Sequence, residues 1–223
     1  MKRKEKKTYY FSVEGETEMW YLNWLQSKIN EKLRKTNTEE VSLKPLKKDP
    51  LKLAKSLPIL FDTTIYRISD YESDEKVHAE QFFKIMDRMK EAEDIGKQIT
   101  YEFGYSNFNF ELWIVLHKAD CNNTLNHRDD YIKLINKAYN ETFENAKKYK
   151  NEANFKRVLS KLELSNVMDA VKRSKRIMRR CKENGYKLLE YKGYRYYKEN
   201  PSLMVGEIIE KILIDCNLIK DNI

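Results

Sequence analysis

A short strand, a tight turn and a helix follow one another in residues 9–18, and this stretch constrains the fold more than any other. Residues 9–13 are mostly aromatic or β-branched and favour a strand, which Glu14 and Gly15 interrupt. Thr17 can cap a helix whose apolar residues recur every three or four positions. Those apolar residues are Tyr21, Leu22, Leu25, Ile29 and Leu33. Strand, glycine turn and helix together open a βαβ unit.

Acidic residues surround this turn. Glu14 lies at the carboxyl end of the predicted strand, where ligands of open α/β sheets gather and where a carboxylate is a poor structural choice. Glu16 and Glu18 fall in the first turn of the helix, where the helix dipole favours negative charge. Acidic residues are ordinary at such positions, so Glu14 is the candidate functional residue of the three.

Further strands and helices alternate up to residue 104. The predicted elements are a strand around residues 41–43, a helix over 49–58, a strand over 63–69, a helix from about Val77 and a strand over 99–104. Pro50 suits the start of the first of these helices and Pro58 its end. The βαβαβαβ order predicts an α/β fold with a mostly parallel sheet flanked by helices on both faces.

The second half of the chain has helical patterns. Residues 110–117 form an apolar run in which periodicity does not decide between a buried helix and a buried strand. Helices are predicted over 130–146, 153–162 and 165–181, a connector over 186–198, and a last helix opening at Asn200 and Pro201. We therefore expect an α/β core over 1–118, a basic helical appendage over 119–199 and a C-terminal helical region over 200–223 that packs back on the core.

Composition bounds the compartment and the partners. The chain has 223 residues, 41% of them hydrophobic, and a formal net charge of +8, which suits a polyanionic partner. Three cysteines lie far apart without a Cys-x-x-Cys pair, so neither a zinc site nor a disulfide framework is expected. The first seven residues lack the apolar segment of a signal peptide, and no run reaches the ~20 apolar residues of a membrane span. We therefore expect a cytoplasmic protein without a membrane partner.

Carboxylates follow two of the predicted strands. Glu14 follows the first strand, and Asp70, Glu72 and Asp74 follow the third. If these strands are neighbours in a parallel sheet, the carboxylates share one crevice and repel one another unless a cation neutralises them. Mg²⁺ or Mn²⁺ would fit such oxygen ligands and would assist phosphoryl transfer. The alternative is that residues 70–75 form an acidic loop that caps the next helix.

Two polar residues interrupt or end the apolar run at 110–117. Glu111 could be an additional metal ligand, or it could form a buried salt bridge with a lysine or arginine. His117 could take part in catalysis, or it could be a hydrogen-bonded histidine of the core. On a helix the two would lie roughly 240° apart and would not share one face.

A strongly basic run lies in residues 172–182, where seven of eleven residues are Lys or Arg and none is acidic. On a helix this run predicts a surface for phosphates, with strong salt dependence. Its candidate nucleic-acid contacts are Lys172, Arg173, Arg176, Arg179 and Arg180. Tyrosines and basic residues then interleave over 191–198, and Tyr194 with Arg195 could stack on and hold bases of a single strand. A solvated helix face and a tyrosine-rich packing ribbon are the alternatives.

Four motifs in this order resemble the RloB-like family, which includes the abortive-infection protein AbiLii and has a Toprim-type core. They are residues 13–18 with Trp20 and Tyr21, Asp70-x-Glu72, residues 106–113, and residues 200–202. The resemblance implies a Toprim fold in which Glu14 is a general acid/base or metal ligand and Asp70 holds Mg²⁺. Glu72 stands where the family pattern has a second aspartate, which leaves open whether Glu72 or Asp74 completes the metal site.

The resemblance also implies a toxic nuclease effector of bacterial phage defence, paired with an ABC-type ATPase. We therefore expect a Mg²⁺- or Mn²⁺-dependent nuclease that cleaves RNA, with tRNA preferred and DNA as a second possibility. It could form a homo-oligomer. Its catalytic residues would be Glu14, Asp70, Glu72, Glu111 and His117, and its metal ligands Glu14, Asp70, Glu72 and Asp74. The alternative is a non-catalytic module that binds nucleic acid or the ATPase, which the Glu72 departure favours.

Overall fold

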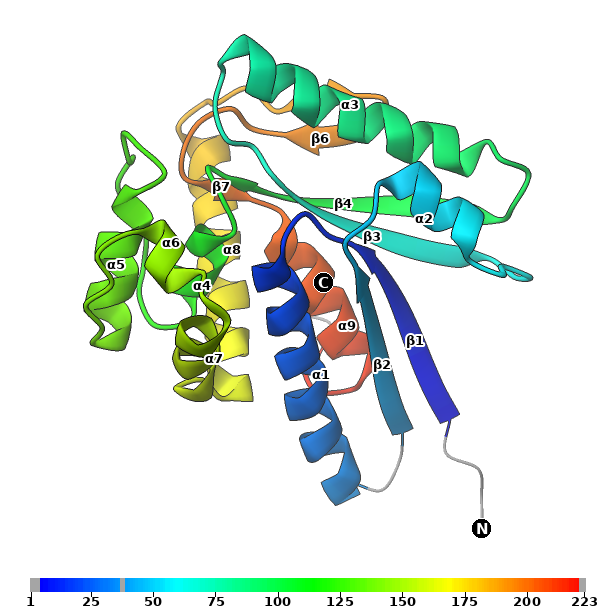
Figure 1. The fold of residues 1–223 in the computed structure, drawn as a ribbon, viewed down its shortest axis with the longest axis horizontal. Helices are drawn as coiled ribbons and strands as arrows, with labels where there is room; N and C mark the ends of the chain where they lie inside the picture. Colours follow the sequence, from blue (N-terminus) through cyan, green and yellow to red (C-terminus); the bar gives the residue numbers. More distant parts are fainter. Residues whose placement is uncertain (1–4, 37–38, 221–223) are drawn as a thin grey trace.

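The structure is a computed structural model that describes residues 5–36 and 39–220 (Figure 1). Strands and helices alternate in the first half, and helices dominate the second. The strands are β1 (Glu5–Ser12), β2 (Glu39–Leu46), β3 (Thr63–Asp70), β4 (Ile99–Asn107), β5 (Leu189–Tyr191), β6 (Tyr194–Tyr196) and β7 (Ser202–Leu203). The helices are α1 (Glu16–Thr36), α2 (Pro50–Ser56), α3 (Lys76–Glu93), α4 (Glu111–Leu116), α5 (Asp130–Tyr139), α6 (Ala146–Tyr149), α7 (Glu152–Ser160), α8 (Leu164–Glu183) and α9 (Val205–Asp215).

The main sheet of the described residues has the strand order β2-β1-β3-β4-β7. The first four strands are parallel, and β7 is antiparallel to β4. The α/β fold with a mostly parallel sheet is thus confirmed, and so is the condition that the first and third strands are neighbours. In the register of β1 and β3, Ser12 lies opposite Arg67, so both strands end at the same edge of the sheet.

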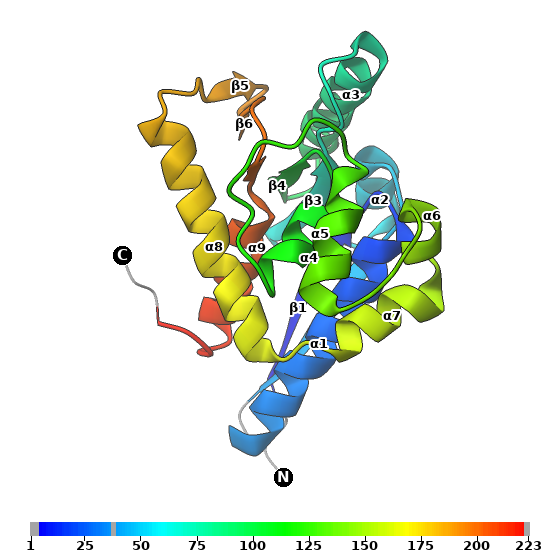
Figure 2. The same ribbon diagram turned by 90° about the vertical axis from the view of Figure 1, so that its left-hand side faces the viewer.

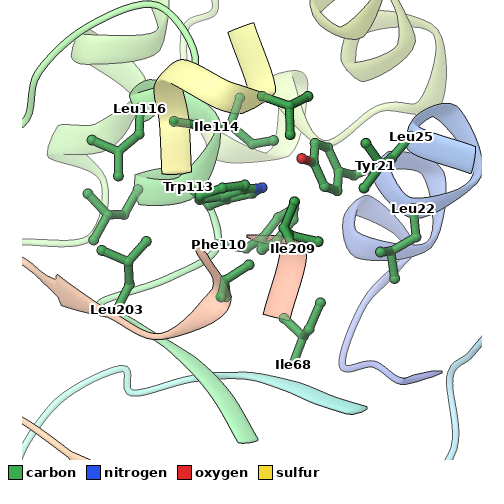
Figure 3. Close-up of a cluster of buried hydrophobic side chains, with 14 of the residues drawn as sticks. Tyr21, Leu22, Leu25, Ile68, Phe110, Trp113, Ile114, Leu116, Leu203 and Ile209 are labelled. Atoms are coloured by element: carbon green, nitrogen blue, oxygen red, sulfur yellow. The ribbon is translucent and has the colours of Figure 1, made fainter. Parts of the chain in front are cut away.

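Helices cover both faces of this sheet, as the strand–helix alternation predicts. Helices α2 and α3 lie on one face and α1 and α9 on the other (Figure 1). Alternate residues of β1 and the apolar side of α1 belong to one hydrophobic cluster, which continues into α4, α5, α7, α8 and α9. The centre of this cluster is formed by Tyr21, Phe110, Trp113 and Ile209 (Figure 3). A second cluster joins α2, α3 and the β5–β6 hairpin over β4.

The last described helix, α9, packs against β4, and it starts later than the sequence predicts. Residues 202–203 first form β7, and α9 begins only at Val205. The fourth strand runs to Asn107 and passes through Gly104 rather than ending there. A Cβ at position 104 would lie 2.6 Å from Cδ1 of Ile208, so the glycine lets α9 approach the strand closely.

The helical half differs from the sequence prediction at two places. The predicted helix over 130–146 is wrong in its second part, because Asn140 adopts a left-handed conformation and ends α5. The predicted connector over 186–198 contains the β5–β6 hairpin, whose two-residue turn has positive φ at Lys192 and Gly193. The undecided run at 110–117 contains the helix α4.

Helix α8 packs against α4 and α9, while α5, α6 and α7 lie on the other side of α4 (Figure 2). The helices of the second half therefore share the first hydrophobic cluster with β1 and α1. The three-part division at residues 118 and 199 stays a prediction, and residues 1–4, 37–38 and 221–223 of those parts lie outside the described residues.

Candidate active site: an acid cluster at the edge of the sheet

The carboxyl ends of β1 and β3 bring Glu14 and Asp70 together. One oxygen of Glu14, Oε2, accepts hydrogen bonds from Oγ of Ser69 at 2.9 Å and from the backbone N of Asp70 at 3.2 Å. These contacts follow from the parallel pairing of β1 and β3, because both strands end at the same edge of the sheet. Glu14 and Asp70 are therefore neighbours, as their positions after adjacent strands require.

A buried arginine, Arg67, lies beside Glu14. Its side chain is 4% exposed, and Nη2 is 3.5 Å from Oε2 of Glu14. Nη1 donates a hydrogen bond to Oγ of Ser12 at 3.0 Å. Burial lowers the pKa of Arg67, and the Glu14 charge acts in the opposite direction. The sequence analysis did not single out Arg67. A lone arginine within a strand of mostly β-branched and aromatic residues could have identified it, because a buried charge requires a partner.

Glu18 is buried as well, which corrects its interpretation as an ordinary first-turn residue of a helix. Oε2 accepts a hydrogen bond from Oγ1 of Thr17 at 2.9 Å. A Cβ at position 15 would lie 2.9 Å from the same oxygen, so Gly15 makes room for the carboxylate. Burial raises the pKa of Glu18, and the charges of Glu14 and Glu111 raise it further.

Glu111, the first residue of α4, is buried with a side chain only 3% exposed. Its Oε1 lies 3.1 Å from Nζ of Lys150, which follows α6. Its Oε2 is buried and, within the described residues, has no hydrogen-bond partner. The salt bridge considered from the sequence is present, but it satisfies only one of the two oxygens.

These four residues, Glu14, Glu18, Asp70 and Glu111, are called the acid cluster below. Burial raises the pKa of Asp70 well above its usual value, and the charges of the other three raise it further, whereas Lys150 lowers it. Oδ1 of Asp70 is buried and lacks a hydrogen-bond partner in the described part of the chain. The protein's own cations therefore compensate the negative charge of the cluster only in part.

Glu72 and Asp74 contact residues outside the acid cluster. Glu72 Oε2 is 3.1 Å from Nε2 of His78 and 3.1 Å from Nη1 of Arg128. Asp74 accepts a hydrogen bond from the hydroxyl of Tyr71 and lies 3.0 Å from Nζ of Lys198. The largest charge effects on Asp70 come from the acid cluster and Lys150 rather than from these two residues.

A cavity of about 370 Å³ opens beside the acid cluster. Its acidic lining residues are Glu14, Asp49, Asp70 and Glu72. Its lysine and arginine lining residues are Lys47, Lys48, Arg67 and Lys84. A phosphodiester in this space would lie close to both carboxylates and cations. Its negative oxygens would contact the lysines and the arginine.

A comparison with models of known protein families shows which family the chain belongs to. The family model of the RloB-like proteins matches residues 9–212. The chain belongs to the RloB-like family. The match includes every candidate site residue from Glu14 to Arg195. No curated protein and no solved structure matches it significantly.

The donor chemistry of the acid cluster in this RloB-like chain suits a hard divalent cation. Carboxylate oxygens are the ligands that Mg²⁺ and Mn²⁺ prefer, and Asp70 and Glu111 each have a buried oxygen without a partner in the described residues. Within residues 5–36 and 39–220, however, no three His, Cys, Asp or Glu side chains are arranged to hold a metal ion. The donors fit, and metal binding would require the carboxylates to move closer together.

His117 of the RloB-like chain lies in the core. Nδ1 is 2.9 Å from the backbone oxygen of Trp113, and Nε2 is 3.1 Å from the hydroxyl of Tyr21 (Figure 3 shows Tyr21 and Trp113). Burial lowers the pKa of His117 to about 4, so the ring is neutral at pH 7. Nδ1–H then donates to the carbonyl, and Nε2 accepts from the tyrosine. This placement favours the hydrogen-bonded core histidine over a catalytic one.

The basic run lies on α8, and part of it holds the helix in place. Nη2 of Arg176 is 2.7 Å from Oδ1 of Asp120, and Nζ of Lys175 is 2.6 Å from Oε1 of Glu210. Arg173 donates to the backbone oxygen of Leu116, and Arg180 donates to Oδ1 of Asn122. Lys172 and Arg179 are exposed on the outer side. Lys175 and Arg176 are exposed as well, so α8 keeps a basic outer face, and its contact with nucleic acid stays a prediction.

The tyrosines that follow α8 pack into the hydrophobic clusters, Tyr194 and Tyr196 into the second and Tyr197 into the first. Tyr194 and Tyr196 are 8% and 3% exposed, and the Tyr196 ring meets the Phe82 ring edge-on at 5.2 Å. Tyr197 is 6% exposed, whereas Arg195 between the tyrosines is exposed. Buried rings offer no free face to a base, so this placement favours the packing ribbon over base stacking. None of the described helices has the length and apolar character of a membrane span.

Proposed function

We propose that this protein is a metal-dependent nuclease that hydrolyses phosphodiester bonds at the acid cluster. The observation that supports it most is the meeting of Glu14 and Asp70 at one sheet edge beside buried carboxylate oxygens that, within the described residues, lack partners. Such an excess of buried negative charge is costly unless a cation neutralises it. A bound Mg²⁺ or Mn²⁺ would supply that charge, lower the pKa of a water and polarise the phosphate.

Glu14, Asp70, Glu18 and Glu111 are the residues that would hold the ion. Glu72 lines the same cavity and could take part after releasing His78 and Arg128. Asp74 is the weaker choice of the predicted ligands, because it does not line the cavity and is bonded to Tyr71 and Lys198.

Glu14 is also the candidate general base. Its carboxylate is 44% exposed toward the cavity side, so it can reach a water beside the substrate. Arg67 and Ser69 fix its Oε2, which leaves Oε1 for the proton of the attacking water. The lysines of the cavity, Lys47, Lys48 and Lys84, would bind the flanking phosphates of the strand.

The substrate we propose is RNA, with tRNA first and DNA second. Membership of the RloB-like family supports a role in phage defence, and the Toprim resemblance supports nuclease chemistry. Within that role the protein would act in the bacterial cytoplasm as a toxic effector. It would be controlled by an ABC-type ATPase and could act as a homo-oligomer.

The test is cleavage of end-labelled RNA and DNA by the purified full chain with Mg²⁺, Mn²⁺ or a chelator. Wild type should cut one of the two polymers only with metal, and Glu14→Gln should not cut. Glu183→Gln, which changes an exposed carboxylate of α8, is the matched control and should cut like wild type. Equal cutting by wild type and Glu14→Gln would refute the assignment.

A non-catalytic module that binds nucleic acid or the ATPase is the second candidate. The arrangement of the acid cluster favours it, because within the described residues no three ligand side chains are placed to hold a metal. Absence of Mn²⁺ binding at millimolar concentrations, together with intact binding of RNA, would support this candidate and exclude the nuclease.

A further inference from the structure

The position of Lys150 beside the acid cluster suggests how metal loading is controlled. Lys150 follows the short helix α6, and the adjacent Tyr149 is fully buried and anchors the segment. Asn145 and Asn151 fix the backbone on both sides, since their side chains accept hydrogen bonds from Lys148 N and Ala153 N. The lysine is thus delivered to the cluster by an ordered piece of chain.

The Lys150 ammonium pairs with a buried carboxylate of the cluster. Nζ is 3.1 Å from Oε1 of Glu111, a carboxylate that is almost completely buried. The ammonium also acts on the charges of Asp70 and Glu18. Arg67, a second cation beside the cluster, lies 3.5 Å from Glu14 and is itself buried. Lys150 instead lies on the Glu111 side of the cluster.

The side chain of Lys150 can also leave. It is 44% exposed, although its Nζ points inward to Glu111. A long, flexible lysine at the surface can swing its ammonium into water, which a buried arginine cannot do, provided that another cation takes its place beside Glu111. Two carboxylate oxygens of the cluster, Oδ1 of Asp70 and Oε2 of Glu111, are buried and, in the described residues, still lack partners. An ion with more charge than an ammonium would satisfy them better.

We propose that Lys150 is an internal counter-ion of the acid cluster, which a divalent metal ion must displace before the site is loaded. This inference rests on the proposed metal-dependent function and concerns its regulation. Without metal, the ammonium stabilises the folded protein by pairing with Glu111. With metal, the same ammonium is a competitor and a repelling charge, so Lys150 sets the metal concentration at which the site fills.

The size of the effect follows from the influence of a single charge on a carboxylate. A positive charge within 4–6 Å lowers the proton affinity of a carboxyl group by about ten- to a thousandfold. A divalent cation experiences the same positive charge at least as strongly. Removal of the Lys150 charge should therefore increase Mn²⁺ affinity by about tenfold or more.

The experiment is calorimetric titration of the full chain with Mn²⁺, without substrate. Lys150→Met should bind Mn²⁺ about tenfold more tightly than wild type or better. Lys147→Met removes an exposed lysine of the adjacent helix α6 and is the matched control, with wild-type affinity expected. Lys150→Arg keeps the charge and should bind no more tightly than wild type. Circular dichroism would establish that each variant is folded, and Lys150→Gln replaces Lys150→Met if the latter is not.

The outcomes separate this inference from the proposed function. Equal or weaker Mn²⁺ binding by folded Lys150→Met, with measurable binding by wild type, overturns the counter-ion and leaves the nuclease intact. Tight binding by Lys150→Met alone supports the counter-ion. Absence of binding by all variants at millimolar Mn²⁺ overturns both.

Discussion

The acid cluster and the helical side of the molecule both bury ionisable groups, and they do so in opposite ways. On the helical side, Glu141 has a side chain 9% exposed but pairs with Arg157 at 2.8 Å and Lys161 at 2.6 Å. These partners lower the pKa of Glu141 to about 2. In the acid cluster, burial and neighbouring carboxylates raise the pKa of Asp70 instead.

The difference teaches that missing compensation, rather than burial, marks the candidate site. Glu141 and His117 have local partners that satisfy them, so their burial is explained by the fold. The carboxylates of Asp70 and Glu111 keep oxygens without a partner in the described residues. Buried polar groups are normally satisfied, and the unpaired carboxylate oxygen of Asp70, a residue that lines the cavity, points to a ligand.

The largest expected effect separates the two regions by activity. Asp70→Asn should reduce cleavage of RNA by about a thousandfold or more, because the amide cannot supply a charged ligand. Glu141→Gln changes a carboxylate to an amide in the same way on the helical side, and its cleavage rate should stay within about twofold of wild type. The cleavage rates of labelled RNA by Asp70→Asn and Glu141→Gln measure these effects. An equal loss of rate in the two variants would show that the acid cluster is no more important for cleavage than Glu141.

His117 should make stability depend on pH on the helical side. Its folded pKa of about 4 lies below the unfolded value of about 6.5. The neutral ring therefore contributes stability that is complete above pH 6.5 and is lost as pH falls toward 4, by about 3 kcal/mol in all. Urea unfolding of wild type between pH 7 and 4 should show this loss, and His117→Gln should reduce it. His127→Gln, which changes a histidine 66% exposed, should retain the wild-type loss.

Glu141→Gln should destabilise the fold, in contrast to its small effect on cleavage. The substitution removes the charge that Arg157 and Lys161 share, at a cost of about 1–2 kcal/mol, since both cations are partly exposed. The Glu141 contribution is present above pH 4.5 and is lost as pH falls toward 2, because the folded pKa is lowered. Urea unfolding at pH 7 measures the cost, with the exposed Glu144→Gln as control. If Glu141→Gln and Glu144→Gln were equally stable, the ion pairs of Glu141 with Arg157 and Lys161 would not stabilise the fold.

The smallest effect concerns the basic helix α8. Lys172→Gln combined with Arg179→Gln should weaken RNA binding and lower the slope of log affinity against log salt by about two, because two phosphate contacts are lost. Lys133→Gln changes a lysine 82% exposed on α5 and should leave the slope unchanged. If the double variant had the wild-type slope, Lys172 and Arg179 of α8 would not contact the phosphates of the RNA.

Sequence reasoning reached the sheet edge because the pattern there is local. An apolar strand that stops at Glu14, and another that stops at Asp70, are each visible within a few residues. Their meeting required only that the two strands be neighbours, which the parallel order of β1 and β3 satisfies. The same reasoning placed the apolar side of α1 against the sheet.

The rest of the site depends on contacts between distant segments, which no local pattern encodes. Glu111 meets Lys150 through the course of α5 and α6, and Glu72 meets Arg128 from the loop before α5. Glu18 resembles any acidic residue of a first helical turn until the fold buries it. The hairpin at 189–196 depended on a Lys-Gly turn that the aromatic pattern around it obscured.

The most direct test of the acid cluster is Mn²⁺ binding by wild type and by Asp70→Asn, followed as the loss of the free-ion signal in electron paramagnetic resonance. The account predicts saturable binding by wild type, weakened by about tenfold or more in folded Asp70→Asn. The same affinity in both proteins would contradict it.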